Sequence, residues 1–183
     1  MRHLLLALAL LAGCSAEAPP ERIVEQRPFQ GEAARGTALL RQAMMAGHNV
    51  ARGRAGVQPL KWSDRLAADA QAYADMLARS GRFEHSREPR GATPEGENLW
   101  TGTRGAYRYD EMVAGWVDER RFYVSRPTPD FSTTGRWQDV AHYTQIIWRH
   151  TTEFGCALAS NKTDDYLVCR YAPPGNVVGD FAT

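Results

Sequence analysis

The order of helical and strand-like patterns along the chain is the feature that most constrains its fold. Two amphipathic segments come first, and their spacing of apolar residues predicts helices over about residues 37–52 and 63–81. The second is the better defined, because Ser63 is a good N-cap and Gly81 a good C-terminal stop. A third helix is predicted over about residues 107–123.

Strand-like patterns lie mainly in the C-terminal third. Residues 155–159 and 166–171 flank a polar turn and predict a β-hairpin, and a further short strand is predicted at residues 98–101. Helices followed by a small sheet predict an α+β domain.

A long connection and a short helix are expected between the third helix and the hairpin. Residues 124–138 are rich in turn residues and predict a loop. Asp139 is placed to cap a short helix whose inward face holds Ile146 and Ile147. Because these two residues are β-branched, a strand remains the alternative.

The first 13 residues have the features of an export signal. Arg2 supplies a positive charge, and residues 4–11 form an apolar run. This run is too short for a permanent transmembrane helix, which needs about 20 residues. We therefore predict that residues 1–13 are a signal peptide.

The sequence Leu11-Ala12-Gly13-Cys14 resembles a bacterial lipobox, in which cleavage precedes the cysteine and the cysteine carries the lipid. This predicts a lipoprotein held in the cell envelope through Cys14, without a spanning segment. Ser15 after the cysteine predicts the outer membrane if the host is Gram-negative. The alternative is an ordinary secretory signal with an incidental cysteine, which predicts a secreted protein.

The mature chain is predicted to have two parts. Residues 14–35 are polar, contain proline and lack periodicity, which predicts a lipidated N-terminus followed by a flexible tether. Residues 36–183 match the size of one domain.

The two remaining cysteines form an even pair. With Cys14 lipidated, Cys156 and Cys169 are left, and they could form a disulfide across the predicted hairpin in an oxidising compartment. A metal site fits less well, because zinc-binding thiolates usually lie close together in sequence. Two free buried thiols are the third possibility.

The charge of the mature chain argues against nucleic acid as a partner. The whole chain has 22 Lys and Arg residues and 21 Asp and Glu residues; removing Arg2 with the signal peptide leaves 21 of each. There is no basic stripe with interleaved aromatic residues, so nucleic-acid binding is not expected.

Two polar residues stand out against apolar surroundings. Glu119 falls on the same predicted helix face as Met112 and Trp116. A carboxylate there needs a cation, a metal, strong hydrogen-bond donors or a wet cleft, unless it forms a surface salt bridge with a neighbouring arginine. His142 opens the apolar run of residues 141–148 and is a candidate wall of a site.

Several motifs follow one another in a specific order. The longest are Ala141-His142-Tyr143-Thr144-Gln145-Ile146-Ile147-Trp148 and Tyr166-Leu167-Val168-Cys169-Arg170-Tyr171-Ala172-Pro173-Pro174-Gly175-Asn176. Shorter ones are His48-Asn49, Pro59-Leu60-Lys61-Trp62, Phe83-Glu84-His85-Ser86, Gly96-Glu97-Asn98-Leu99 and Trp116-Val117-Asp118-Glu119-Arg120. Together, over about residues 39–178, they resemble the CAP superfamily, the secreted SCP/PR-1-like domains. Ala141 departs from the pattern, which usually has glycine. The resemblance implies a three-layer α-β-α sandwich.

The resemblance also implies a central cleft with two histidines and two glutamates. The matching residues are His85, Glu97, Glu119 and His142. Two imidazoles can hold a divalent transition metal such as Zn²⁺, and the implied ligands are His85 and His142. Because catalytic zinc usually has three protein ligands, such binding should be weak, and no cofactor is expected to be required.

The resemblance implies a binding module more than an enzyme. The expected partners are a hydrophobic small molecule, such as a sterol or another lipid, or a protein, held by the cleft and by the loop of residues 124–137. In that loop, Phe131 and Trp137 could offer an apolar contact. The alternative is a metal-assisted peptidase or esterase, with Glu97 or Glu119 as general base.

Simpler interpretations stand beside these. Ser86 or Thr103 could act as a nucleophile next to a histidine, but serine in such a loop is more often a turn residue. The four cleft residues could also form a satisfied polar network that ties helices to the sheet. His48 is expected to be bonded within the first helix, and His150 to lie on the surface.

Overall fold

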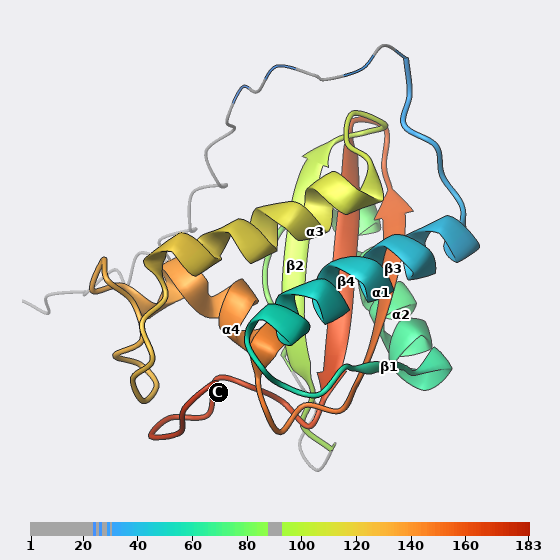
Figure 1. Cartoon of the computed structure of the whole chain (residues 1–183). Helices are drawn as coiled ribbons and strands as arrows, with labels where there is room; N and C mark the ends of the chain where they lie inside the picture. The colour runs from blue at the N-terminus through green and yellow to red at the C-terminus, as the bar shows by residue number, and fades with distance from the viewer. Residues whose placement is uncertain (1–23, 25, 27–28, 30, 88–92) are drawn as a thin grey trace, which may run out of the picture.

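A computed structural model describes Val24, Gln26, Phe29, residues 31–87 and residues 93–183. Most of the described chain forms one mixed sheet with helices on both sides (Figure 1). The predicted signal peptide, Cys14 and most of the predicted tether lie outside the described residues. Within the described part, none of the helices has the length and apolar character needed to cross a bilayer.

The sheet has four strands in the order β1-β3-β4-β2. Their bounds are β1 (Lys61–Trp62), β2 (Gly96–Thr103), β3 (Glu153–Ser160) and β4 (Asp164–Ala172). β4 is antiparallel to both β2 and β3, whereas β1 runs parallel to β3. The predicted hairpin is therefore confirmed as β3–β4, and the short predicted strand is β2, which extends further at both ends.

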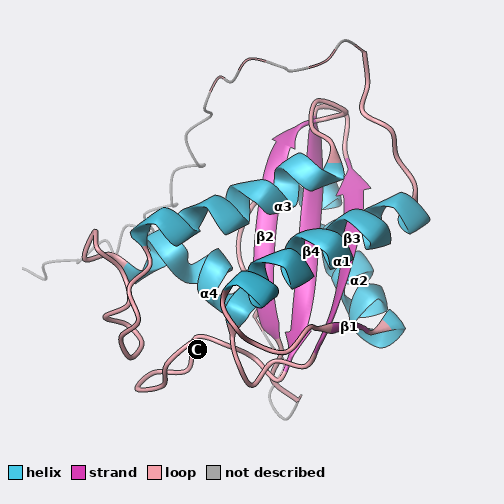
Figure 2. Cartoon of the chain, in the orientation of Figure 1, coloured by secondary structure: helices cyan, strands magenta, loops and turns pink. Residues whose placement is uncertain are grey.

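Helices cover the sheet on both faces (Figure 2). They are α1 (Thr37–Arg54), α2 (Asp64–Ser80), α3 (Tyr109–Asp118) and α4 (Ala141–Ile147), with 3-10 turns η1 (Glu119–Phe122) and η2 (Trp137–Val140). α1, α3 and α4 lie on one face and α2 on the other. This arrangement confirms the α-β-α sandwich.

Each face of the sheet has its own hydrophobic core. The larger core holds Trp116, Tyr143 and Trp148 against the side of the sheet that carries Tyr171. The smaller core packs α2 on the opposite side, where Leu77 meets Val168. α2 lies very close to β3, because a Cβ on Gly155 would stand 2.2 Å from the Ala67 nitrogen.

Two local predictions are corrected. The third helix does not continue to Tyr123, because the α-helix ends at Asp118 and Glu119 begins a 3-10 turn. Asp139 does not cap the next helix: it lies within η2, and its side chain accepts a hydrogen bond from Thr134 (Oγ1 to Oδ2, 2.7 Å). Ile146 is helical, as predicted, so the strand alternative is not realised.

A disulfide joins Cys156 to Cys169 across the hairpin. The two residues face each other in the β3–β4 register, and both are buried. The predicted pairing is confirmed, and the alternatives of free thiols or a thiolate metal site do not apply to these residues.

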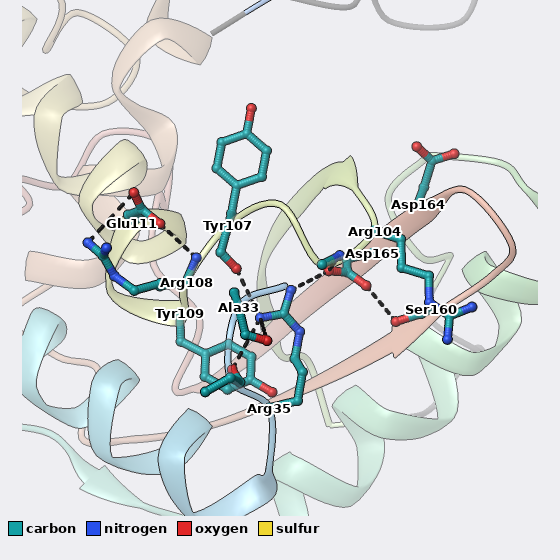
Figure 3. A network of polar contacts seen from close by, with 12 residues as sticks. Ala33, Arg35, Arg104, Tyr107, Arg108, Tyr109, Glu111, Ser160, Asp164 and Asp165 are labelled. Carbon is teal, nitrogen blue, oxygen red and sulfur yellow. Dashed lines mark hydrogen bonds and ion pairs between the residues drawn. The ribbon is translucent and has the colours of Figure 1, made fainter. Parts of the chain in front are cut away.

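The last residues of the predicted tether are bound to the domain (Figure 3). The Ala33 amide donates to the Gly105 carbonyl (2.9 Å), and Arg35 donates to the buried carboxylate of Asp165 (Nη2 to Oδ2, 2.6 Å). Asp165 also accepts from the Ser160 hydroxyl and the Gly105 amide. Contacts with the domain therefore include Ala33, Arg35 and also Phe29, whose ring lies 5.4 Å from the Arg108 guanidinium.

Candidate functional site

Glu119 and His142 form a close pair at the start of α4. His142 Nδ1 lies 2.6 Å from Glu119 Oε1, while Glu119 Oε2 accepts hydrogen bonds from the backbone amides of His142 (3.0 Å) and Tyr143 (3.1 Å). The carboxylate therefore satisfies first-turn amides that have no partner within the helix. These hydrogen bonds are the strong donors that a carboxylate on an apolar helix face was expected to need.

The His142 imidazole is also held by an aromatic neighbour. Its ring stacks on Trp116, with centroids 5.8 Å apart and planes 17° apart. The Trp116 indole in turn donates to the Leu99 carbonyl of β2 (3.2 Å). α3, α4 and the edge strand β2 thus fix this histidine together.

His85 and Glu97 form a second close pair on the other side of the sheet. His85 Nδ1 lies 2.7 Å from Glu97 Oε1, which also accepts the Ser86 amide (3.0 Å). Glu97 follows Gly96 at the start of β2, whereas His85 comes from the loop after α2. Glu97 is nearly buried, but the His85 side chain is 66% exposed.

Arg170 supplies the positive charge next to Glu97. The two residues face each other in the β2–β4 register, with Arg170 Nη2 3.0 Å from Glu97 Oε2. The contact is an ion pair without hydrogen-bond geometry. Within the part of the chain that the structure describes, Glu97 Oε2 and Arg170 Nε are buried and have no hydrogen-bond partner. The Arg170 guanidinium also lies 5.2 Å from the centre of the Tyr73 ring.

These neighbours determine the ionisation of Glu97. Burial acts to raise its pKa, but the hydrogen bond from His85, the charge of Arg170 and the Ser86 amide outweigh burial and hold the pKa below its usual value. For Tyr73, burial and then the Glu97 and Glu84 carboxylates raise the pKa to about 12. Glu97 is therefore a stable carboxylate and Tyr73 a stable phenol near neutral pH.

A short polar chain connects the two pairs. Asn98, the residue after Glu97, donates from Nδ2 to the His142 carbonyl (3.1 Å) and to the Tyr171 hydroxyl (3.0 Å). Tyr171 lies 2.8 Å from His48 Nε2, and His48 Nδ1 lies 2.8 Å from the Met44 carbonyl. His48 is bonded within α1, as predicted, and also ties α1 to the sheet.

The two carboxylates hold their histidines in the same way. In each pair the carboxylate holds Nδ1, and Nε2 has no hydrogen bond among the described residues. His85 lines a cavity on the α2 side of the sheet, whereas His142 stacks on Trp116 and lines neither described cavity. The described residues contain no group of three or more His, Cys, Asp or Glu side chains that could hold a metal ion.

A cavity of about 890 Å³ adjoins the His85–Glu97 pair. α2 lines it with Ala72, Tyr73 and Met76, and Arg170 lines it from β4. Arg65, which also lines it, is held by Asp69 (2.8 Å) and Glu95 (2.7 Å). The cavity thus combines an apolar wall with several charged groups.

The other candidate residues lie apart from this cavity or make different contacts. Thr103 is exposed at the end of β2, and His150 is exposed, as expected. The Ser86 hydroxyl has no hydrogen bond to a histidine within the described residues. Phe131 is fully buried, so it cannot form the ligand contact considered for the loop, whereas Trp137 is exposed.

Two residues of the site were not singled out from the sequence. Arg170 and Asn98 both lie inside the quoted motifs, but their strand context alone gave no reason to separate them from structural residues. The register that places Arg170 opposite Glu97 is visible only in the folded sheet.

Comparison with known proteins identifies the family. Residues 45–171 match the model described as "CAP: Cysteine-rich secretory protein family". The chain belongs to the CAP family. This membership confirms the resemblance seen in the sequence and supports export of the protein.

Individual relatives agree with this assignment. The CAP domain is 38% identical to pathogenesis-related protein 1C of Nicotiana tabacum over 139 residues, which cover 75% of this chain and 77% of the relative. It is 39% identical to protein PRY2 of Saccharomyces cerevisiae over 125 residues, covering 67% of this chain and 33% of that longer protein.

Solved structures of low sequence identity share the fold. NaASP2, crystallised with Zn²⁺, superimposes with a TM-score of 0.63 at 21% identity, over 86% of this chain and 89% of that one. BmVAL-1 gives a TM-score of 0.63 at 24% identity, over 84% and 86% of the two chains.

Proposed function

We propose that this CAP protein is a binding module of the cell envelope that takes up a small lipid-like molecule in the cavity beside His85 and Glu97. The observation that carries the proposal is the composition of this cavity. Tyr73 and Met76 offer an apolar wall, while Arg170 can contact a polar head group. A protein partner at the same cleft is the other occupant that this surface could serve.

The proposal is tested by filling the cavity. Ala72 is exposed and lines it, so Ala72→Trp should reduce its volume without disturbing the core of α2. Ala46→Trp is a matched control, because Ala46 is also an exposed helical alanine but lines neither described cavity. Native mass spectrometry of protein incubated with mixed sterols and fatty acids should show a bound lipid that is lost only in Ala72→Trp. Absence of any bound lipid, or equal binding by both variants, would refute the proposal.

A metal-assisted hydrolase is the second candidate function. It is supported by the two Nε2 atoms left available when Glu97 and Glu119 hold the Nδ1 atoms, and NaASP2, which shares the fold, has been crystallised with Zn²⁺. A bound metal would supply Lewis-acid activation, while the two carboxylates would orient the imidazoles and accept protons. Calorimetric titration with ZnCl₂ should give weak binding that disappears in the His85→Ala/His142→Ala double variant. Hydrolysis of peptide and ester panels that depends on both Zn²⁺ and these histidines would favour this candidate over the binding module.

Anchoring in the envelope is a separate part of the proposal. Cys14 would carry the lipid, with outer-membrane placement in a Gram-negative host. Metabolic labelling with a fatty-acid analogue should mark the wild-type chain, and Cys14→Ser should lose the label and leave the membrane fraction. Labelling that persists in Cys14→Ser would contradict lipidation at this residue.

A further inference from the structure

One edge of the sheet is open along most of β3. β1 pairs with β3 only at Lys61 and Trp62, opposite Glu153 and Phe154. The Ser63 amide donates to the Phe154 carbonyl (2.8 Å), so the backbone polar groups of Phe154 point towards β1. Beyond this point no strand of the described chain continues along the edge.

The direction of the free backbone groups follows from the strand register. Phe154 points away from β4, and backbone groups in a strand alternate between its two sides, so Cys156 and Leu158 also direct their N–H and C=O groups outwards. The Asn161 amide donates to Asp164 at the end of the hairpin, which confirms that the odd-numbered residues of β3 face β4. No backbone partner outside the strands is present for Cys156 or Leu158 among the described residues. The edge thus offers an alternating row of unpaired donors and acceptors.

This edge forms the floor of a groove of about 760 Å³ between α1 and α2. On the α1 side the groove is lined by Leu40, Trp62 and Tyr109, and on the α2 side by Ala67 and Ala68. Figure 1 shows α1 and α2 on opposite sides of β3. The free backbone groups therefore lie between two walls that combine these apolar residues with polar ones, among them Arg41 and Gln71.

The charges near the groove are paired. Arg41 of α1 lies 3.6 Å from Asp64, the first residue of α2, and stacks over the Trp62 ring at 5.4 Å. Arg35, at the opposite end, is bound to Asp165. Recognition in this groove therefore depends on backbone hydrogen bonds and apolar side chains more than on charge.

These features distinguish between possible occupants. A second copy of the folded chain would have its own β3 recessed between its own α1 and α2, so the two edges could not approach to the strand spacing of about 4.8 Å. An acyl chain would cover the free N–H and C=O groups without bonding them, which is unfavourable. A single extended peptide satisfies these groups and can place alternate side chains against the two walls.

We propose that the β3 edge between α1 and α2 binds an extended peptide segment of a partner protein by β-strand addition. The segment pairs with Cys156 and Leu158, directs apolar side chains towards Leu40 and Tyr109, and directs small side chains towards Ala67 and Ala68. From Cys156 to Ser160 the edge spans about 13 Å, at about 3.3 Å per residue, which accommodates four or five residues of the peptide. This site is separate from the histidine–glutamate cleft.

A selection experiment tests the proposal directly. The full chain is immobilised and challenged with a random heptapeptide library displayed on phage, and enriched sequences are synthesised with a fluorescent label. The expected sequences alternate apolar and small residues and lack net charge. Ala68→Arg, an exposed substitution on the groove wall, should weaken their binding about tenfold or more. The matched control Ala46→Arg, also an exposed helical alanine, should leave binding unchanged.

Backbone modification then identifies the mode of binding. Two versions of each peptide are made, one N-methylated at the odd-numbered amides and one at the even-numbered amides. One version should lose binding and the other should bind almost normally, because only one edge of the peptide pairs with β3. Hydrogen exchange at the Cys156 and Leu158 amides should slow when peptide is bound. The proposal is overturned if no enriched peptide loses affinity in Ala68→Arg, or if both N-methylated sets bind equally. It is also overturned if light scattering shows a dimer that Ala68→Arg disrupts, or if palmitate rather than peptide protects these amides.

Discussion

The two histidine–glutamate pairs contain the same residue types but use their carboxylates differently. Glu119 accepts two backbone amides of α4 as well as His142, so its function is tied to the start of a helix. Glu97 accepts a hydrogen bond from one backbone amide, contacts the His85 ring and forms an ion pair with Arg170. This pair lies beside a cavity. The imidazoles differ as well, since the side chain of His142 is 29% exposed and that of His85 66% exposed.

This difference indicates which pair can respond to a ligand. The Glu119–His142 pair is held by α3, α4 and the Trp116 ring, so both of its side chains are part of the packing around the start of α4. The Glu97–His85 pair combines a buried ion pair with an exposed imidazole that can move without disturbing a core. We therefore expect ligand effects to be concentrated at His85.

The largest effect on stability is expected from Glu97→Ala. Removing the carboxylate leaves the Arg170 side chain, which is only 9% exposed, without its counter-charge, and breaking such a pair costs about 3 kcal/mol. Urea unfolding should show this loss. Arg170→Met in the same chain should restore part of the stability, and a double variant as unstable as Glu97→Ala would show that the charge is not the cause.

Glu119→Ala is expected to cost less, about 2 kcal/mol, because it leaves two first-turn amides of α4 without acceptors. Hydrogen exchange should accelerate at the His142 and Tyr143 amides. Glu119→Gln keeps an acceptor in place and should retain more of the stability. If exchange at these amides is unchanged in Glu119→Ala, the capping role is wrong.

The stability of the Glu97 pair should depend on pH. Because the pKa of folded Glu97 lies below its ordinary value of 4.5, its contribution is present above about pH 4.5 and is lost as the pH falls through the lowered pKa. The limit for one group is about 1.4 kcal/mol per pH unit. Wild type should therefore lose stability more steeply than Glu97→Gln below pH 4.5, as measured by urea unfolding at several pH values.

His48 provides an internal reference for this comparison. Burial lowers the pKa of His48 to about 3, so it also destabilises the fold progressively as the pH falls below about 6.5. Because both proteins contain His48, the difference between their slopes isolates Glu97. Parallel slopes would mean that Glu97 has no lowered pKa.

The smallest effect is expected from the histidines themselves. His85→Ala should change stability by less than about 0.5 kcal/mol, because its side chain is mostly exposed. His142→Ala removes the stacked ring over Trp116 and should cost about 1 kcal/mol. Thermal unfolding of the two variants measures the difference, and equal losses would contradict the asymmetry between the pairs.

Local patterns predicted most elements of this fold. The helical spacing of Leu66, Ala70, Tyr73 and Leu77 located α2 to within a residue at each end, because one face of that helix meets a single core. The third helix was predicted too long, since its pattern continues through Glu119. The backbone there forms a 3-10 turn, and the Glu119 carboxylate contacts the start of α4. The periodicity of apolar residues does not predict a contact between two separate helices.

The site was predicted only as a set of residue types. The family motifs named His85, Glu97, Glu119 and His142, but not which residues would pair or on which face of the sheet. Arg170 follows Glu97 by more than 70 residues, and only the β2–β4 register places them opposite each other.

The sequence alone determined the α+β order and the hairpin and left Cys156 and Cys169 placed to pair across it, because each depends on the spacing of residues near one another along the chain. The tertiary structure alone decided that Glu97 pairs with Arg170, that Glu119 caps α4 and that β3 keeps an open edge. These features depend on strand register, on the packing of layers and on β1 being only two residues long. Such contacts join segments that are far apart in the sequence, and local sequence patterns do not specify which distant segment each one packs against.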